Sequence, residues 1–445
     1  MIGRCDRCSA FPRPQGCVVL ALLSGLLFGR PGLVSAQTDW AEPRVYFGKA
    51  TLETGSLLSR EGDDQPWKVA RDVFTRDRLL ALGGLKTVVA PVSDAIKLVL
   101  WGNLPAQSPL PILESSAILH DTGAFDLDIT LLSGRAVITN TKKKGSAKIW
   151  LRMPGEGWEV TLDGPGSTVA LDLYGRWPHG VPFVKNPFAP ERPISVLSLQ
   201  VIEGSADVRF GGRQQRLGTP PGPSILHWDS VEGAGSGPQR LDKLPDWATG
   251  PGTLPDELKS LPEVVASYLK LCDQGPVPAL LALLTSADSE KDANRASVTR
   301  EFAVLGLAAC GALPHLAEVL ASSHSAELRE TIVLAMRHWI GSAPGRDLQL
   351  YAMLIGYAKY TERQADTLLQ LLHSPFDPKD PATYQTLIAY LQHDKPAIRA
   401  LARWHLYRLV PSGAKIAYDP NGTPEARAKA AQEWKQLIPD GSLPK

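Results

Sequence analysis

The sequence of 445 residues has no excess of charge of one sign, no long apolar run and few cysteines. Lys and Arg number 47 and Asp and Glu number 46, which gives a net charge of +1 at pH 7. This balance gives no reason to expect nucleic acid or an anionic membrane as a partner. The hydrophobic fraction of 44% is typical of globular proteins that bury sizeable cores.

Common catalytic motifs are also missing. The sequence contains no G-x-S-x-G, no H-E-x-x-H, no paired C-x-x-C motifs and no P-loop. These patterns mark serine hydrolases, zinc peptidases, zinc or redox sites and nucleotide-binding proteins. The sequence therefore predicts a protein that is not an enzyme, with no catalytic residue, no metal site and no cofactor.

The N-terminal segment has the features of a secretory signal peptide. Three arginines precede the apolar run 17–28, and the small residues Val34-Ser35-Ala36 follow it. A signal peptide has this order of regions, and the run is too short for a transmembrane helix. We expect residues 1–36 to be cleaved near Ala36, which leaves a periplasmic or secreted protein without a membrane span. An uncleaved anchor is the alternative.

Three of the five cysteines lie within this segment, so only Cys272 and Cys310 remain after cleavage. In an oxidising compartment these two cysteines could form one disulfide. The alternative is two buried thiols that pack as small apolar groups. Spacing in the sequence does not establish the geometry that a bridge needs.

From about residue 45 to residue 228, apolar and polar residues alternate, and turn residues interrupt the pattern about every ten positions. This alternation predicts half-buried antiparallel strands. The clearest strand begins at Phe125, and Ser133-Gly134-Arg135 predicts a turn after it. A hairpin is expected over 149–162, and a further strand pair over 196–210. Many short strands with Gly and Pro breaks favour an antiparallel β-sandwich or jelly-roll-like domain.

Four short motifs follow one another near the end of this region. They are Val201-Ile202-Glu203-Gly204-Ser205-Ala206-Asp207-Val208, Gly211-Gly212, Arg216-Leu217-Gly218 and Pro220-Pro221-Gly222. This order of strand, glycine turn, strand and glycine resembles FecR-like extracytoplasmic domains, over about Arg78 to Pro223. The resemblance implies a β domain outside the cytoplasm, and we expect that domain over residues 37–229.

Glycine and proline are concentrated in residues 230–255, which predicts a linker. After the linker the apolar period changes to 3.6, as in the stripe from Leu261 to Leu271. The change predicts an all-α domain over residues 256–445. Thr423 followed by Pro424 predicts the start of its last helix.

Two segments of this all-α domain look alike. The apolar stretch 313–320 and the stretch 387–391 are each followed by a short polar break. A second helix then opens with Leu328-Arg329 in one segment and with Ile398-Arg399 in the other. This pattern resembles HEAT or armadillo repeats, which stack into a helical-repeat solenoid. A third, less regular unit is expected over 349–372, and an irregular helical bundle is the alternative.

Asp126 and Asp128 are the strongest acidic candidates for a binding site. Alternation places both carboxylates on one face of a strand, where they could share a cation or act in sugar chemistry. The alternative is a solvated sheet face, which alternation predicts without any function.

Tryptophans supply the other candidates. Trp150 falls on the strand face that carries Lys148 and Arg152, where it could stack on a sugar or anchor a protein partner. The alternative is a second packed face of the sheet. The loop Trp177-Pro178-His179-Gly180 could line a pocket. The candidate binding surface therefore comprises Asp126, Asp128, Lys148, Trp150, Arg152, Trp177 and His179.

These observations predict an exported, non-enzymatic binding or scaffold protein. Helical solenoids present extended surfaces, and β-sandwiches present loops and a broad face. We therefore expect a protein partner in the cell envelope. The alternative is a glycan-binding protein, or a glycan-acting enzyme, that uses the β domain.

Overall fold

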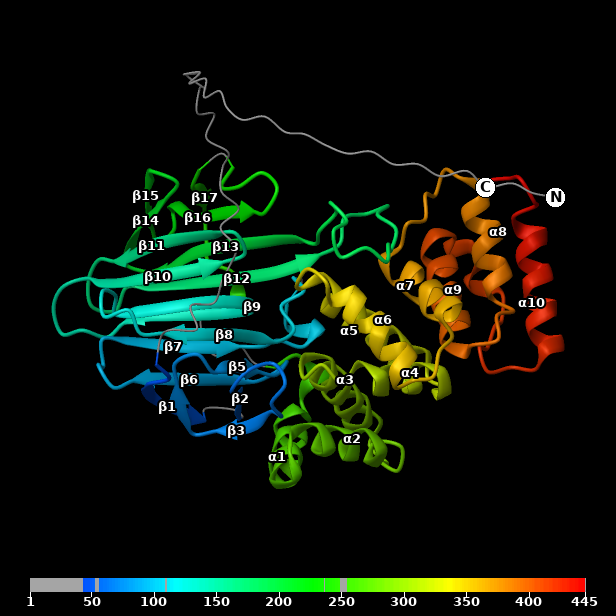
Figure 1. The fold of residues 1–445 in the computed structure, drawn as a ribbon, viewed down its shortest axis with the longest axis horizontal. Helices are drawn as coiled ribbons and strands as arrows, with labels where there is room; N and C mark the ends of the chain where they lie inside the picture. Colours follow the sequence, from blue (N-terminus) through cyan, green and yellow to red (C-terminus); the bar gives the residue numbers. More distant parts are fainter. Residues whose placement is uncertain (1–42, 53–55, 109, 236, 249–253, 445) are drawn as a thin grey trace, which may run out of the picture. The chain divides into compact units, whose positions relative to one another are not determined.

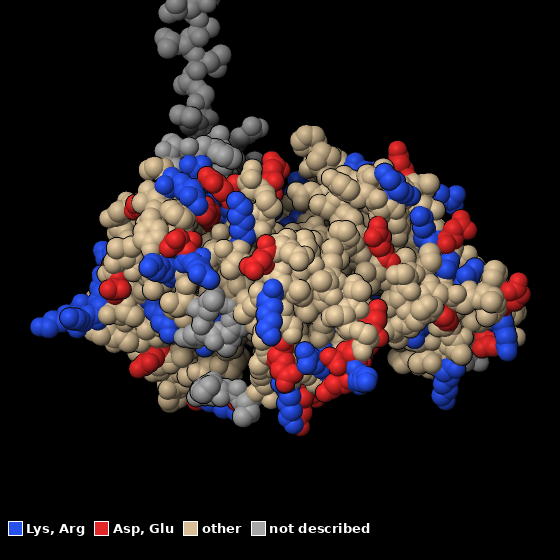
Figure 2. Space-filling view, turned by 90° about the horizontal axis from the view of Figure 1, so that it is seen from below, with Lys and Arg blue, Asp and Glu red and all other residues tan. Residues whose placement is uncertain are grey.

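The computed structural model describes residues 43–52, 56–108, 110–235, 237–248 and 254–444, so the predicted signal peptide lies outside the described residues. Strands occupy the chain up to residue 241, and α-helices follow from residue 261. The predicted order of a β region and then a helical region is confirmed (Figure 1). On the face shown in Figure 2, basic and acidic side chains are interspersed.

The β region is a mixed network of strands that pair side by side. The strands are β1 (Tyr46–Leu52), β2 (Leu57–Arg60), β3 (Lys68–Ala70), β4 (Asp72–Phe74), β5 (Arg78–Ala81), β6 (Lys86–Pro91), β7 (Ile96–Trp101), β8 (Ser115–His120), β9 (Leu127–Asn140), β10 (Ala147–Met153), β11 (Glu156–Leu162), β12 (Thr168–Arg176), β13 (Ile194–Glu203), β14 (Ser205–Phe210), β15 (Arg213–Gly218), β16 (Gly222–Asp229) and β17 (Gln239–Leu241).

The long strand β9 joins two branches of this network. Its first half pairs with β8 and β10, and its second half pairs with β7 and β12. The partners change at Gly134, where φ is 86° and a Cβ atom would lie 1.9 Å from the carbonyl oxygen of Glu114. The turn predicted at 133–135 is therefore a change of partner within one continuous strand.

The prediction of a purely antiparallel sheet was wrong at β9 and β10, which pair in parallel with Ile149 opposite Leu127. Because β9 changes branch at Gly134, the short connection 141–146 can return the chain alongside its first half. The hairpin predicted over 149–162 is confirmed, since β10 and β11 are antiparallel with Met153 opposite Glu156.

The two strands predicted over 196–210 are present as β13 and β14, but the structure pairs them with other strands. β13 pairs with β12 and β16, whereas β14 pairs with β11 and β15. Gly204, with φ of 69°, separates the two strands, and a Cβ atom there would lie 2.4 Å from Ser167 Oγ. Glycine therefore permits a second sharp change of branch.

The helical region contains the predicted helix pairs. Its helices are α1 (Leu261–Leu271), α2 (Pro276–Ser286), α3 (Ala293–Ala309), α4 (Leu313–Ser322), α5 (Ala326–Gly341), α6 (Arg346–Gly356), α7 (Glu362–His373), α8 (Pro381–Tyr390), α9 (Pro396–Leu409) and α10 (Pro424–Leu437). The expected start of the last helix is confirmed, because Thr423 Oγ1 accepts a bond from the backbone N–H of Ala426 at 3.3 Å. Such caps satisfy N–H groups that lack a partner within the helix.

Apolar side chains form two cores. One core fills the space between the strands and includes Leu57 and Leu79; the other fills the helical region and includes Leu58 and Leu80 from the same two strands. Successive side chains on a strand point to opposite faces. Strands β2 and β5 are therefore buried on both faces, because the helical core extends onto them.

The predicted linker is partly built into the β region. Strand β17 pairs with β16, and the Trp247 ring lies 5.9 Å from the Trp101 ring. Among the described residues, no helix is long and apolar enough to cross a membrane.

Candidate functional site

The candidate residues fall into two groups. Asp126, Asp128, Lys148, Trp150 and Arg152 belong to the paired strands β9 and β10 or directly precede them, and the register places Trp150 opposite Asp128. Trp177 and His179 lie instead in the loop that follows β12. The candidate binding surface predicted from the sequence is therefore divided between two places.

The two aspartates each have a cation of their own. Asp126 accepts a bond from Lys142 Nζ at 2.7 Å, while Arg152 donates two bonds of 2.8 Å to Asp128. The Asp128 side chain is only 2% exposed, so it is not part of a solvated face. Within the described residues, no group of three or more His, Cys, Asp or Glu is placed to hold a metal ion. The separate pairing favours a structural role for both carboxylates.

Trp150 is half-buried on the sheet. Its ring lies 5.6 Å from the ring of Phe125, which is also half-buried. Gly157 on β11 leaves room for the indole, because a Cβ atom at that glycine would lie 2.7 Å from the Trp150 ring. The two rings form a partly exposed aromatic pair, which suits stacking against an apolar surface.

Trp177 packs against the helical region, whereas His179 is exposed. The Trp177 indole donates to the carbonyl oxygen of Ile340 at 3.1 Å, and its ring lies 4.4 Å from the His373 ring. Trp177 lines a cleft of about 190 Å³ between the loop after β12 and the start of α6, but His179 is not among its described lining residues.

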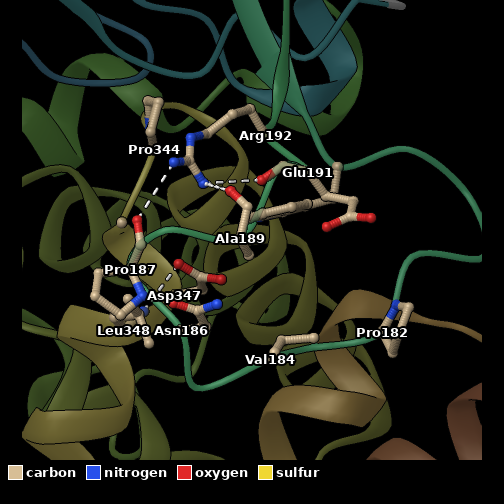
Figure 3. Close-up of a pocket in the computed structure, with 12 residues that line it drawn as sticks. Pro182, Val184, Asn186, Pro187, Ala189, Glu191, Arg192, Pro344, Asp347 and Leu348 are labelled. Atoms are coloured by element: carbon tan, nitrogen blue, oxygen red, sulfur yellow. Dashed lines mark hydrogen bonds between the residues drawn. The ribbon is translucent and has the colours of Figure 1, made fainter.

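The lining of this cleft offers few side chains that could take part in catalysis (Figure 3). Arg192 turns back on its own loop and donates to the carbonyl oxygens of Ala189, Glu191 and Pro187. The buried Asp347 carboxylate lies 3.4 Å from His373 Nε2. None of the described residues that line the cleft is Ser, Thr, Cys or Lys, so this lining lacks side chains that commonly act as nucleophiles in acyl transfer.

A buried polar cluster that sequence reasoning missed joins the β region to the helices. Glu114 accepts a bond from Ser133 Oγ at 2.9 Å and lies 2.8 Å from His338 Nε2 on α5. Burial raises the pKa of Glu114, but the charges and bonds of His338, the charge of Arg346 and the Ser133 bond outweigh it and hold the pKa at about 2. No spacing in the sequence connects Glu114 to His338, because the two are far apart along the chain.

Further contacts cross the same junction between strands and helices. The Trp67 indole donates to the carbonyl oxygen of Cys310 at 3.2 Å, and the Gln370 amide exchanges two bonds with the backbone of Phe183. Gly175 on β12 approaches α5 so closely that a Cβ atom would lie 2.1 Å from the carbonyl oxygen of Gly341. The junction therefore combines specific polar bonds with close backbone packing.

A second buried ion pair lies inside the β region. Arg135 donates two bonds to Asp172, at 2.6 and 3.0 Å, and its guanidinium carbon lies 3.5 Å from the centre of the Trp247 ring. The predicted linker thus covers a buried charge.

Cys272 and Cys310 are free thiols, and burial raises the pKa of both.

No protein-family model, no curated protein and no solved structure matches this chain. The FecR-like and HEAT-like resemblances therefore stay predictions.

Proposed function

We propose that the protein is an exported, non-enzymatic binding or scaffold protein of the cell envelope. In this proposal the β region is a FecR-like sandwich, the helices are HEAT-like repeats, and the helical surface contacts a protein partner.

The junction between strands and helices carries the proposal. The Glu114–His338 contact of 2.8 Å, the Trp67 and Gln370 bonds and the shared helical core fix the helices on the β region. A scaffold needs its binding surfaces held in a constant relation, and buried specific contacts supply that rigidity.

A repeated bond supports the helical-repeat part of the proposal. The Arg329 guanidinium donates to the carbonyl oxygen of Ser323, and the Arg399 guanidinium donates to that of His393. In both cases the acceptor lies six residues before the arginine, in the turn between two helices. The two similar sequence segments thus use the same residue for the same local contact, as repeats of one structural unit would.

Photo-crosslinking in the native cell envelope tests the proposed function. We expect a photoreactive residue at the exposed Leu334 on α5 to give an adduct with one defined protein. The same residue at the exposed Val92, in the β region, serves as the matched control and should not give that adduct. Full-length protein is required, because removal of the helices would expose the apolar faces of β2 and β5. Identical adducts at both positions, or none at Leu334, would argue against a partner on the helices.

The aromatic pair of Trp150 and Phe125 favours glycan binding as the second candidate function. Flat, partly exposed rings stack on the apolar faces of sugars. If this function is correct, Trp150→Ala should abolish retention of the protein on envelope polysaccharide without altering its circular dichroism. Val92→Ala, which also removes exposed apolar surface, should leave retention unchanged. Undiminished retention of the Trp150→Ala protein would exclude this strand face as the glycan site.

A further inference from the structure

A groove between α5 and α9 is rich in arginine. It has a volume of about 230 Å³, and its lining includes Arg329, Arg403, Arg408, Trp404, Tyr407 and Glu330. Val333 and Ala400 form the floor of the groove but are only 1% and 5% exposed, so they offer little apolar surface. The groove therefore joins several cationic groups to a small apolar area.

The positive charge of the groove is only partly neutralised. Arg329 lies 3.3 Å from Asp419, and Glu330 adds a carboxylate to the lining. Among the described residues, Arg403 and Arg408 pack on aromatic rings and form no ion pair within 4.0 Å. The Nε atoms of Arg329 and Arg403 are buried and have no hydrogen-bond partner among the described residues. A ligand in the groove would therefore be bound by the terminal N–H groups of Arg403 and Arg408 and not by these enclosed Nε atoms.

Like charges act on one another across the same helices. Burial lowers the pKa of Arg329, and the charge of Arg403 lowers it further. Burial also lowers the pKa of Arg337 on α5, and the charge of Arg408 adds to this effect. Asp419 acts in the opposite direction on Arg329, and its effect is larger than that of Arg403. A bound anion would reduce the remaining repulsion that involves Arg403 and Arg408.

The aromatic rings hold the guanidinium groups in place. The guanidinium carbon of Arg403 lies 4.5 Å from the centre of the Tyr407 ring, and that of Arg408 lies 4.5 Å from the centre of the Trp404 ring. Guanidinium groups that pack on rings keep their N–H edges available for planar carboxylates. Because these ring faces already contact cations, they are less suited to stack on bases or sugars.

We infer that the α5–α9 groove binds glutamate side chains of an acidic segment in the protein partner. The carboxylates meet Arg403 and Arg408. This inference rests on the proposed function and names the chemistry of the partner. The small volume and the balanced charge of the whole chain favour a short acidic peptide over a long polyanion.

Fluorescence anisotropy with a fluorescein-labelled pentaglutamate peptide and the full chain tests the groove. We expect binding that weakens as salt is added, whereas a pentaglutamine peptide should not bind. The double variant Arg403→Gln/Arg408→Gln should lose about tenfold or more in affinity, because it removes two charge-assisted contacts. Lys429→Gln/Lys435→Gln on α10 removes the same charge from exposed positions and should bind as the wild type does.

Two further measurements separate a loss of the binding site from a loss of the fold. Circular dichroism should show that the double variant is folded; Arg408→Lys, which keeps the charge and loses the planar fork, should bind with intermediate affinity. No binding of pentaglutamate by the wild type, or equal losses in both double variants, would overturn the inference. If the Leu334 adduct still forms in that case, the proposed scaffold function stands and only the acidic-segment inference fails.

Discussion

Asp172→Ala should lower the free energy of unfolding by about 3–5 kcal/mol, because it leaves the Arg135 guanidinium buried without its counterion. In the wild type, Asp172 accepts two bonds from Arg135, whose side chain is 0% exposed. Trp101 and Trp247 lie near the same guanidinium and keep it from water. Urea unfolding followed by tryptophan fluorescence measures the loss.

The Arg152–Asp128 pair, also in the β region, is the matched control. Arg152 binds Asp128 with the same two-bond geometry, but the Arg152 side chain is 37% exposed. Water can therefore solvate Arg152 after Asp128→Ala, and we expect a smaller loss, of about 1–2 kcal/mol. The double variant Arg135→Met/Asp172→Leu should be more stable than Asp172→Ala, because it removes both charges. Equal losses for Asp128→Ala and Asp172→Ala would contradict the burial argument.

Acid should lower the free energy of unfolding, because it protonates Glu114 at the junction between the strands and the helices. The pKa of Glu114 is about 2 in the folded chain, below its ordinary value of 4.5. A carboxyl group whose pKa is lower in the folded state stabilises the fold above the unfolded pKa, and this contribution is lost as the pH falls through the folded pKa. The shift corresponds to about 3 kcal/mol. We therefore expect protonation of Glu114 to lower the free energy of unfolding by about this amount between pH 4.5 and pH 2.

Glu114→Gln isolates this contribution. The variant should be less stable than the wild type at neutral pH, and the difference between the two should shrink as the pH falls from 4.5 to 2. Denaturant unfolding at several pH values measures both curves. Glu232→Gln, at an exposed position, should follow the wild-type curve throughout. A constant difference between wild type and Glu114→Gln across this pH range would show that the Glu114 carboxylate does not stabilise the junction.

Much of the local structure follows from patterns that neighbouring residues carry. Alternation located β10 and β11 and their turn, and the 3.6-residue period located the helix pairs of the second half. Thr423 was identifiable as a cap because the chemistry of a helix start is confined to a few adjacent residues.

Strand partners were harder to predict, because they depend on contacts between distant residues. Gly134 and Gly204 look like ordinary turn residues in the sequence, yet each lies where the chain changes from one set of strands to another. Alternation shows on which face of the sheet a side chain lies, but it does not show which strands pair with each other. The parallel pairing of β9 and β10 therefore could not be derived from period two.

The candidate site, too, was predicted only in part from the sequence. Asp126, Asp128 and Trp150 were found from alternation, but their partners Lys142, Arg152 and Phe125 became evident only in the structure. The Glu114–His338 contact joins residues that are far apart in the sequence, and the repeat pattern located α5 and α9 without showing that their arginines line one groove.

The amino-acid sequence alone was sufficient for the order of a β region and then a helical region, because periodicity and caps are local properties. Only the tertiary structure decided which strands are neighbours, that the helices cover β2 and β5, and which charges share a buried site. Those features arise when distant apolar surfaces are buried together, and burial then makes each enclosed charge depend on the partners that packing places beside it.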